Sequence, residues 1–396
     1  MPTSQSSAGH LLELIRSGQA TTRSELQTAT GLSRSTVGMR LDQLFRAGWL
    51  RNTAGTSTGG RPSARLEFDV CHAAVLVVDL DTTHSRVAVT DLAGTILSER
   101  TEPLPVSEGP ETVLETVASW MPGLLEATGT EAASVCGIGL SVPGPVDWET
   151  GMIVEPPIMP GWSRYPVRAT LQAAFTRHMH VRSAPPVLLD NDANLMAYGE
   201  QRHHYPHCPA LVLVKVSAGI GAGVILSGTP YRGIDGGVGD MGHIRLHDRD
   251  DALCTCGSYG CLAAVASGRA IAQELSRAGV PTASAAEAAA HLATGQPDAV
   301  RLTREAGQRT GEVLVTVVTF LNPAVLVIAG DMASTPFLTG VRELLYRRAM
   351  PRTTAHLTVT TSQLGDRAAL MGAAAMVVEH LYSPEIADAR LASAGP

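Results

Sequence analysis

The sequence contains almost no lysine. Of its 30 basic residues, Lys215 is the one lysine and the others are arginines. We interpret this bias as the signature of GC-rich coding DNA rather than as chemistry. Long apolar runs are also missing, because no stretch approaches the roughly 18–20 residues of a membrane-spanning helix. The first ten residues, MPTSQSSAGH, have neither the basic nor the apolar segment of a signal peptide, so we expect a cytoplasmic protein with no membrane contact.

Cysteine is scarce too, yet half of it lies in one place. Three of the six cysteines fall within residues 254–261, and in a reducing cytoplasm such a cluster indicates a metal site rather than disulfide bonds. With a preceding histidine they form the pattern H-x10-C-x-C-x4-C, which predicts a closed tetrahedral Zn²⁺ site at His243, Cys254, Cys256 and Cys261. The alternative is three buried thiols beside an unrelated histidine.

Length and charge suggest a composite protein. The 396 residues are enough for two or three domains, and the net charge of −7 is unevenly distributed. Residues 1–70 contain eight arginines against five Asp and Glu residues, so a small basic segment precedes an acidic remainder. This distribution favours contact with nucleic acid through the first segment alone.

Residues 1–70 predict a winged helix-turn-helix. Helices are expected over 10–16, over 23–29 after a Thr22 cap, and from Ser33 to about Ala47. A strand from Leu50, a loop of small residues and a strand over 64–68 would form the wing. The start of the third helix and the wing tip are the parts that enter DNA grooves. The DNA-binding candidates are Arg34, Ser35, Thr36, Arg40, Gly60 and Arg61. The alternative is a generic three-helix bundle with a hairpin.

The first segment resembles the winged head of ROK-family repressors, through GLSRSTVGMRLDQLFRAGWL and GGRP. The resemblance implies an α/β body of two lobes with the actin-like ATPase fold of the family's sugar kinases. We therefore expect a first lobe over 71–190 and a second lobe over 191–382, which includes the metal site and a C-terminal crossing helix. A flexible tail over 383–396 is expected to follow.

Sequence patterns predict the elements of the body. Strands are expected at 74–80, 85–90 and 95–100, a helix at 110–129, and a short strand from Val187 that leads into a helix. A strand, a glycine-rich hairpin over 217–223 and a second strand come next, followed by a mostly helical region over 266–320. The last expected elements are a strand over 325–333 and a helix over 367–381.

One phosphate loop of the kinases is altered and the other is kept. The kinase pattern D-x-G-G-T is replaced by Asp79-Leu80-Asp81-Thr82-Thr83, which lacks both glycines and adds a negative charge at Asp81. Glycines in such a loop let backbone N–H groups approach phosphate, so this change argues against ATP use. The glycine-rich segment 217–223 survives, and we attribute its glycines to a hinge that needs positive φ.

The resemblance also implies a sugar site. Its residues would be Gly144, Asn191, Asp192, Asp240 and His243, with Asp192 at the position of the kinase general base. Asp240 stands where the family has a sugar-binding Glu, and Ala263 replaces a second one. From the pattern alone, a carboxylate at the end of the strand before 191 could equally well cap the next helix.

These observations predict a DNA-binding transcriptional regulator rather than an enzyme. We expect a repressor of carbohydrate genes that binds a palindromic operator as a homodimer or homotetramer and responds to a monosaccharide or derivative between its lobes. One alternative is an ATP-dependent sugar kinase with an added DNA-binding head. A second is a regulator that no longer binds sugar.

Overall fold

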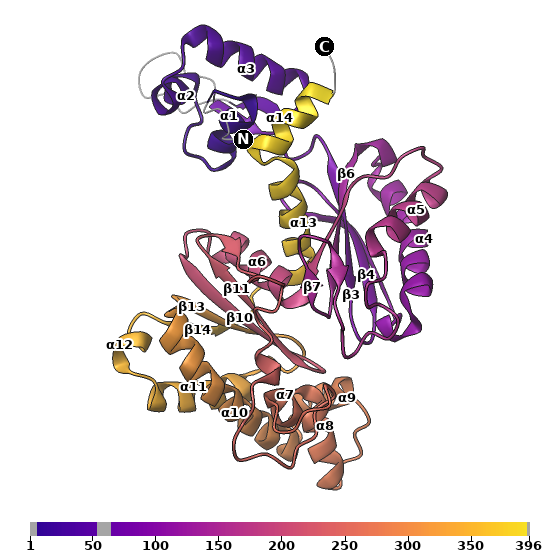
Figure 1. Ribbon diagram of the computed structural model, residues 1–396, viewed down its shortest axis with the longest axis vertical. Coiled ribbons are helices and arrows are strands. Elements are labelled where there is room, and N and C mark those ends of the chain that lie inside the picture. The colour runs from indigo at the N-terminus through magenta and orange to yellow at the C-terminus, as the bar shows by residue number, and fades with distance from the viewer. Residues whose placement is uncertain (1–5, 54–64, 394–396) are drawn as a thin grey trace.

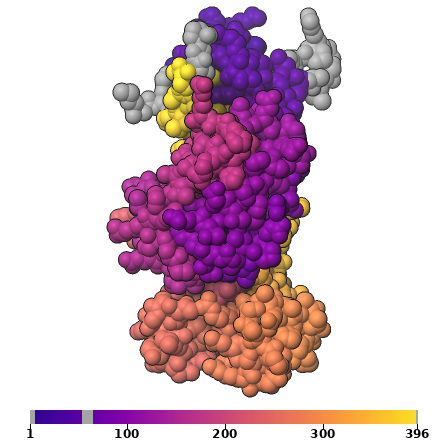
Figure 2. Space-filling view, turned by 90° about the vertical axis from the view of Figure 1, so that its right-hand side faces the viewer, coloured from indigo at the N-terminus to yellow at the C-terminus, as the bar shows by residue number. Residues whose placement is uncertain are grey.

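The computed structural model describes residues 6–53 and 65–393. The chain forms a small helical head and two α/β lobes, joined by a long helix that runs from between the lobes up to the head (Figure 1). Figure 2 shows the head, the first lobe and the second lobe as successive masses along the long axis. None of the helices in the described ranges combines the length and the apolarity that a bilayer crossing requires.

The head is the predicted winged helix-turn-helix. Thr22 and Glu25 form a capping box at the start of the second helix, which ends at Gly31 with φ +69°. Ser33 caps the third helix by accepting a hydrogen bond from the Thr36 N–H (3.2 Å). The two wing strands pair antiparallel. The elements are α1 (Ala8–Arg16), α2 (Arg23–Thr30), α3 (Arg34–Arg46), β1 (Leu50–Thr53) and β2 (Arg65–Phe68).

The first lobe is a five-stranded sheet in the order β5-β4-β3-β6-β9. Its first three strands form an antiparallel meander, and β6 and β9 continue it in parallel. Helices α4 and α5 cover its outer face (Figure 1). The elements are β3 (Ala74–Leu80), β4 (Ser85–Thr90), β5 (Ile96–Glu102), η1 (Val106–Glu108), α4 (Pro110–Thr128), η2 (Ala132–Ser134), β6 (Val135–Val142), β7 (Val146–Asp147), β8 (Met152–Ile153), α5 (Val167–Met179) and β9 (Val187–Asn191).

The second lobe repeats this topology with the sheet order β12-β11-β10-β13-β14. Helices α10 and α11 lie below its outer face in Figure 1. The elements are α6 (Asp192–His204), β10 (Ala210–Val216), β11 (Ile220–Leu226), β12 (Thr229–Pro230), η3 (Met241–His243), α7 (Leu262–Ala266), α8 (Gly268–Arg277), α9 (Ala285–Ala293), α10 (Pro297–Leu321), β13 (Val325–Ala329), α11 (Thr335–Arg348), α12 (Pro351–Thr354), β14 (Thr358–Thr361), η4 (Gly365–Arg367), α13 (Ala368–Leu381) and α14 (Pro384–Ser393).

Helices α6 and α13 pack against each other between the two sheets. Small residues make this contact close, since a Cβ on Gly372 of α13 would lie 1.8 Å from the Leu195 carbonyl oxygen of α6. Helix α13 also approaches the first sheet closely, since a Cβ on Gly139 of β6 would lie 2.8 Å from the Ala373 carbonyl oxygen. Close-packed interiors transmit displacements because they do not compress. Any change in the angle between the lobes therefore acts on α13.

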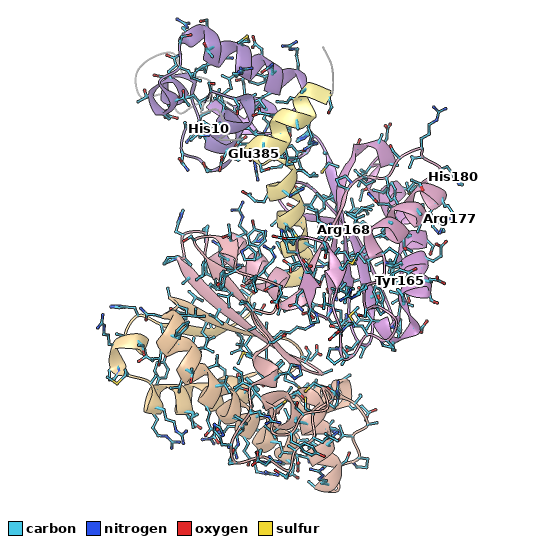
Figure 3. All side chains as sticks on the ribbon, viewed as in Figure 1. His10, Tyr165, Arg168, Arg177, His180 and Glu385 are labelled. Carbon is cyan, nitrogen blue, oxygen red and sulfur yellow. The ribbon has the colours of Figure 1, made fainter. Side chains whose placement is uncertain are left out.

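The expectation of a flexible tail over 383–396 is wrong for residues 384–393. These residues form α14, which packs on α1 of the head. The Gly9 N–H donates to Asp388 Oδ1 (2.8 Å) and Ala387 is fully buried. His10 and Glu385 mark this junction in Figure 3. The tail thus belongs to the head, and the polar, small composition of the segment concealed a helix that tertiary packing stabilises.

Candidate ligand and metal site

The four predicted metal ligands converge. The ligand atoms of His243, Cys254, Cys256 and Cys261 all lie within 4.8 Å of one another. His243 Nδ1 is 3.7 Å from Cys254 Sγ, and the sulfurs of Cys256 and Cys261 are 3.8 Å apart. A tetrahedron with metal–sulfur bonds of about 2.3 Å has edges of about 3.8 Å, and the two separations above match this length.

The thiols are poised to ionise unequally. Burial opposes ionisation of Cys256, but hydrogen bonds from the Ser258 backbone and from the neighbouring thiols outweigh it and lower the pKa of Cys256 to about 6. Burial and the neighbouring sulfurs raise the pKa of Cys261. Thiolates are the form that binds metal. Gly257 and Gly260 both have positive φ, which lets the backbone turn tightly between Cys256 and Cys261.

Glycines bring the metal segment against the second sheet. A Cβ on Gly239 would lie 1.9 Å from the Ala222 carbonyl oxygen, and one on Gly242 would lie 2.2 Å from that of Ile220. The short helix η3, which carries His243, therefore rests directly on β11.

A cavity of about 590 Å³ opens between the lobes beside this cluster. Residues from both lobes line it, and five of the predicted ligand residues are among them, together with the first residues of the altered loop. The lining includes Asp81, Thr82, Gly144, Asn191, Asp192, Lys215, Asp240, His243, Ala263 and Arg269. Because His243, Cys254 and Cys256 also line the cavity, the cavity and the cluster share three side chains.

Asn191 and Asp192 stand where β9 of the first lobe becomes α6. Asn191 Oδ1 accepts from the N–H of Ala193 (3.0 Å) and caps α6, while its Nδ2 donates to the Gly144 carbonyl (3.1 Å). The capping role therefore falls to Asn191. Asp192 is the first residue of the helix, and its Oδ1 accepts from the Ala193 N–H (2.7 Å), which leaves Oδ2 directed to another partner.

That partner is Lys215, whose placement overturns our interpretation of the single lysine as coding bias alone. Lys215 Nζ is 2.6 Å from Asp192 Oδ2 and 3.0 Å from Asp81 Oδ2. Burial alone would lower the pKa of Lys215, but the carboxylates of Asp192, Asp81 and Asp79 outweigh it and raise it well above its ordinary value. The scarcity of lysine was the signal that could have marked this residue.

The comparisons with known proteins agree with this architecture. The ROK family matches residues 75–380. The chain belongs to the ROK family. A ROK-family transcriptional regulator, described as a homolog of E. coli MLC protein, has the same fold over 98% of this chain and 99% of its own, with a TM-score of 0.79 and 22% identity.

Two curated relatives differ in how much of the chain they match. The xylose repressor of Caldicellulosiruptor bescii is 26% identical over 95% of this chain and 96% of its own length. The glucokinase of Thermotoga maritima is 30% identical over 77% of this chain and 97% of its own. The first match includes the head, whereas 23% of this chain lies outside the second.

The altered first loop of this ROK chain has its hydrogen bonds satisfied internally. The N–H and hydroxyl of Thr82 both donate to Asp81 Oδ1 (2.5 and 3.0 Å). Burial opposes ionisation of Asp81, but Lys215 and Thr82 outweigh it and lower its pKa to about 2. A backbone donor that could face a phosphate is thus occupied by a carboxylate.

The explanation offered for the glycine-rich hairpin is wrong. Gly219, Gly221 and Gly223 do not have positive φ. Instead, a Cβ on Gly223 would lie 2.3 Å from the Ala193 carbonyl oxygen. Gly223 of β11 must be glycine because α6 crosses it at close range, with or without a nucleotide, whereas a Cβ on Gly219 would meet nothing within 4 Å.

Two positions at which the resemblance implies sugar-binding carboxylates are altered here. Asp240 lines the cavity, and burial raises its pKa. Ala263 lines it as well and offers no hydrogen-bonding group. Arg177 and His180, which Figure 3 labels, lie at the outer edge of the first lobe and are not among the residues that line the cavity.

The predicted DNA-binding residues divide into three groups. Arg34 and Ser35 are exposed at the start of α3. Thr36 is partly buried, and its hydroxyl is hydrogen-bonded to that of Ser33 (2.9 Å). Arg40 Nε donates to the Ser6 carbonyl (3.1 Å), which draws its guanidinium towards the N-terminal segment. Gly60 and Arg61 lie outside the described residues.

Proposed function

We propose that this chain is a sugar-responsive transcriptional repressor, which binds a palindromic operator through its head and a monosaccharide or derivative in the interlobe cavity. The observation that carries the proposal is the attachment of the head to α13, the helix that crosses between both lobes. A ligand that favours one arrangement of the lobes would change operator affinity by its difference in affinity for the two arrangements.

The attachment consists of ion pairs, hydrogen bonds and ring contacts. Arg16 of α1 pairs with Glu379 of α13 (3.0 Å) and donates to the Tyr382 carbonyl (3.1 Å). The Tyr382 hydroxyl is hydrogen-bonded to His72 Nε2 (2.7 Å), and its ring lies 5.2 Å from that of Trp49. The Arg390 guanidinium of α14 covers the Tyr382 ring at 4.6 Å. The head cannot rotate freely against α13 while these contacts hold.

The relatives support the repressor over other ROK activities. The C. bescii protein that matches nearly the whole chain is named a xylose repressor, and this match includes the head. On this basis we propose a pentose or hexose as the ligand class. Asn191, Asp192, Asp240 and His243 would contact its hydroxyls, and homodimers or homotetramers would place two heads on the operator half-sites.

We also propose that the cluster of one histidine and three cysteines holds Zn²⁺. The four side chains fit a closed tetrahedral site in number, type and spacing. With four protein ligands, such an ion supplies structural stabilisation and leaves no position for an activated water. His243 would then be fixed at the cavity wall by its Nδ1, which leaves its other ring nitrogen for a ligand.

The second candidate is a sugar kinase. It is favoured by the 30% identity to the T. maritima glucokinase and by Asp192 at the position of the general base. The internally bonded Asp81 loop opposes it. A coupled ATP-turnover assay with D-glucose, D-xylose and other simple sugars separates the two. Sustained turnover that Asp192→Asn abolishes would defeat the repressor as the sole function.

The repressor itself is tested by capture of genomic fragments. Purified protein should retain a small set of fragments that share a palindrome, with half-sites about one or two helical turns apart. Retention of random fragments only, or of none, would contradict the proposal. Competition with excess nonspecific DNA is the control, because electrostatic binding alone does not distinguish sequences.

A further inference from the structure

Lys215 lies at the one point of the described structure where three parts of the body meet through buried charges. It projects from β10 of the second lobe, and its side chain is 15% exposed. Asp81 follows β3 of the first lobe, and Asp192 begins α6 between the lobes. Both carboxylates are largely buried, at 19% and 10% exposure. Buried charges of this kind require partners.

We propose that Lys215 determines what the cavity accepts, by holding Asp192 and Asp81 together as an interlobe latch that a ligand must displace from Asp192. Among the described residues, Lys215 makes the ion pairs of both carboxylates. Asp192 Oδ2 is therefore occupied, and the same ammonium ties the first lobe to the second. This inference rests on the proposed function for its consequence, namely that displacement of the latch alters the lobes and hence α13.

The latch explains two features of the cavity together. Asp192 Oδ2 is occupied by the Lys215 ammonium, so it does not face a substrate hydroxyl and is held out of the role of general base. A neutral polyol can replace the ammonium because its hydroxyl donates to the carboxylate. A phosphorylated sugar cannot do so as readily, since it adds negative charge beside two carboxylates that share one cation.

The sequence provides an unusually clean probe of this arrangement. Lys215 is the only ε-amine of the chain, and acetylation by sulfo-N-hydroxysuccinimide acetate requires a neutral amine. Each unit by which the pKa of an amine falls raises its neutral fraction about tenfold. The acetylation rate of Lys215, measured by peptide mass spectrometry against added Nα-acetyl-lysine, therefore reports how tightly both carboxylates hold it.

The experiment compares the full chain with three isosteric variants, without DNA or sugar. Asp81→Asn and Asp192→Asn each remove one ion pair and should raise the acetylation rate by about tenfold. Glu155→Gln is the matched control, because Glu155 lines the same cavity but makes no ion pair with Lys215. Small-angle scattering should show a larger radius of gyration for Asp81→Asn and no change for Glu155→Gln.

The outcomes separate the latch from simpler accounts. An unchanged rate in Asp81→Asn, or unchanged scattering despite a faster rate, would overturn the interlobe role. A comparable rise in Glu155→Gln would mean that the charge of the cavity as a whole, rather than the two ion pairs, protects Lys215. Because none of these measurements involves an operator, failure of the latch leaves the repressor to be judged on DNA binding alone.

Discussion

At the residue scale, the structure brings four side chains of the segment 243–261 into one cluster, and beside it Lys215 pairs with Asp81 and Asp192. The cysteine spacing predicts its site because all four ligands come from residues 243–261, so local chain geometry alone brings them together. Lys215 and Asp81 are 134 residues apart, and their contact depends on how the two lobes pack. No local pattern carries that information. The rarity of lysine distinguishes Lys215 from the other basic residues but does not identify its partners.

Loss of one metal ligand should destabilise the protein. Cys256→Ser is expected to lower the metal content from about one ion per chain to near zero and to reduce the melting temperature by several degrees, because metal binding is coupled to folding. Plasma emission spectroscopy and thermal unfolding measure both effects. Cys71→Ser is the control, since Cys71 is exposed and lies outside the cluster. A wild-type protein that contains no metal after purification would contradict the assignment.

Asp79 should make stability fall as the pH rises. Burial raises the pKa of Asp79 to about 7, despite the attraction of Lys215. The folded chain therefore keeps a proton between about pH 4 and pH 7 that the unfolded chain releases, so this stabilisation is full below that window and is lost as the pH rises through 7.

The neutral variant Asp79→Asn isolates this effect. It should melt close to the wild type at about pH 4 and a few degrees above it at about pH 8, because the wild type loses this stabilisation across the window whereas asparagine has no proton to lose. Calorimetric scans across this range measure the difference. A difference that does not change with pH would show that Asp79 does not titrate in this window.

At the scale of elements, caps and periodicity predicted most helices and strands, and the C-terminal segment is the informative failure. Helix α14 has two large apolar residues, Ile386 and Leu391, and it is stabilised where Ala387 and Asp388 meet α1. A helix of this kind is stabilised by its partner rather than by its own propensity. The head–body junction therefore could not be predicted from the sequence of the N-terminal or the C-terminal segment alone.

Weakening α14 should loosen the head. Asp388→Ala removes the acceptor of the Gly9 N–H and should increase the rate at which trypsin cleaves within the head by about threefold to tenfold, since proteolysis follows local opening. Glu385→Ala is the matched control, because Glu385 lies on the same helix but is exposed. Equal cleavage rates of both variants would contradict the conclusion that the Asp388 contact of α14 holds the head in place.

Helix α3 should contact DNA at its first turn. Arg34→Ala is expected to weaken operator binding by about tenfold without changing the melting temperature, because Arg34 is exposed at the end that a recognition helix presents. Arg46→Ala provides the control from the last turn of the same helix. Fluorescence anisotropy on an operator duplex measures the affinity of both variants. A larger loss of affinity for Arg46→Ala would mean that the last turn of α3, rather than the first, faces the DNA.

At the scale of the whole molecule, family resemblance predicted the head and the two-lobed body, and the structure adds how they are joined. The crossing helix α13 packs on the first sheet and on α6, and it continues into the junction with the head. Under the proposed function, this arrangement would connect a ligand in the cavity to the head through packed helices. Under the proposed function, the identity of the ligand would depend on a few side chains of the cavity, Asp240 and Ala263 among them.

The most direct test of this account is operator affinity with and without sugar. Anisotropy titrations should show that one uncharged pentose or hexose changes the operator dissociation constant by about tenfold or more, and that Asn191→Ala removes this response while operator binding persists. Tight, specific binding that no sugar alters would contradict the sugar-responsive repressor. Absence of specific binding, together with ATP-dependent phosphorylation of a sugar, would replace it with the kinase.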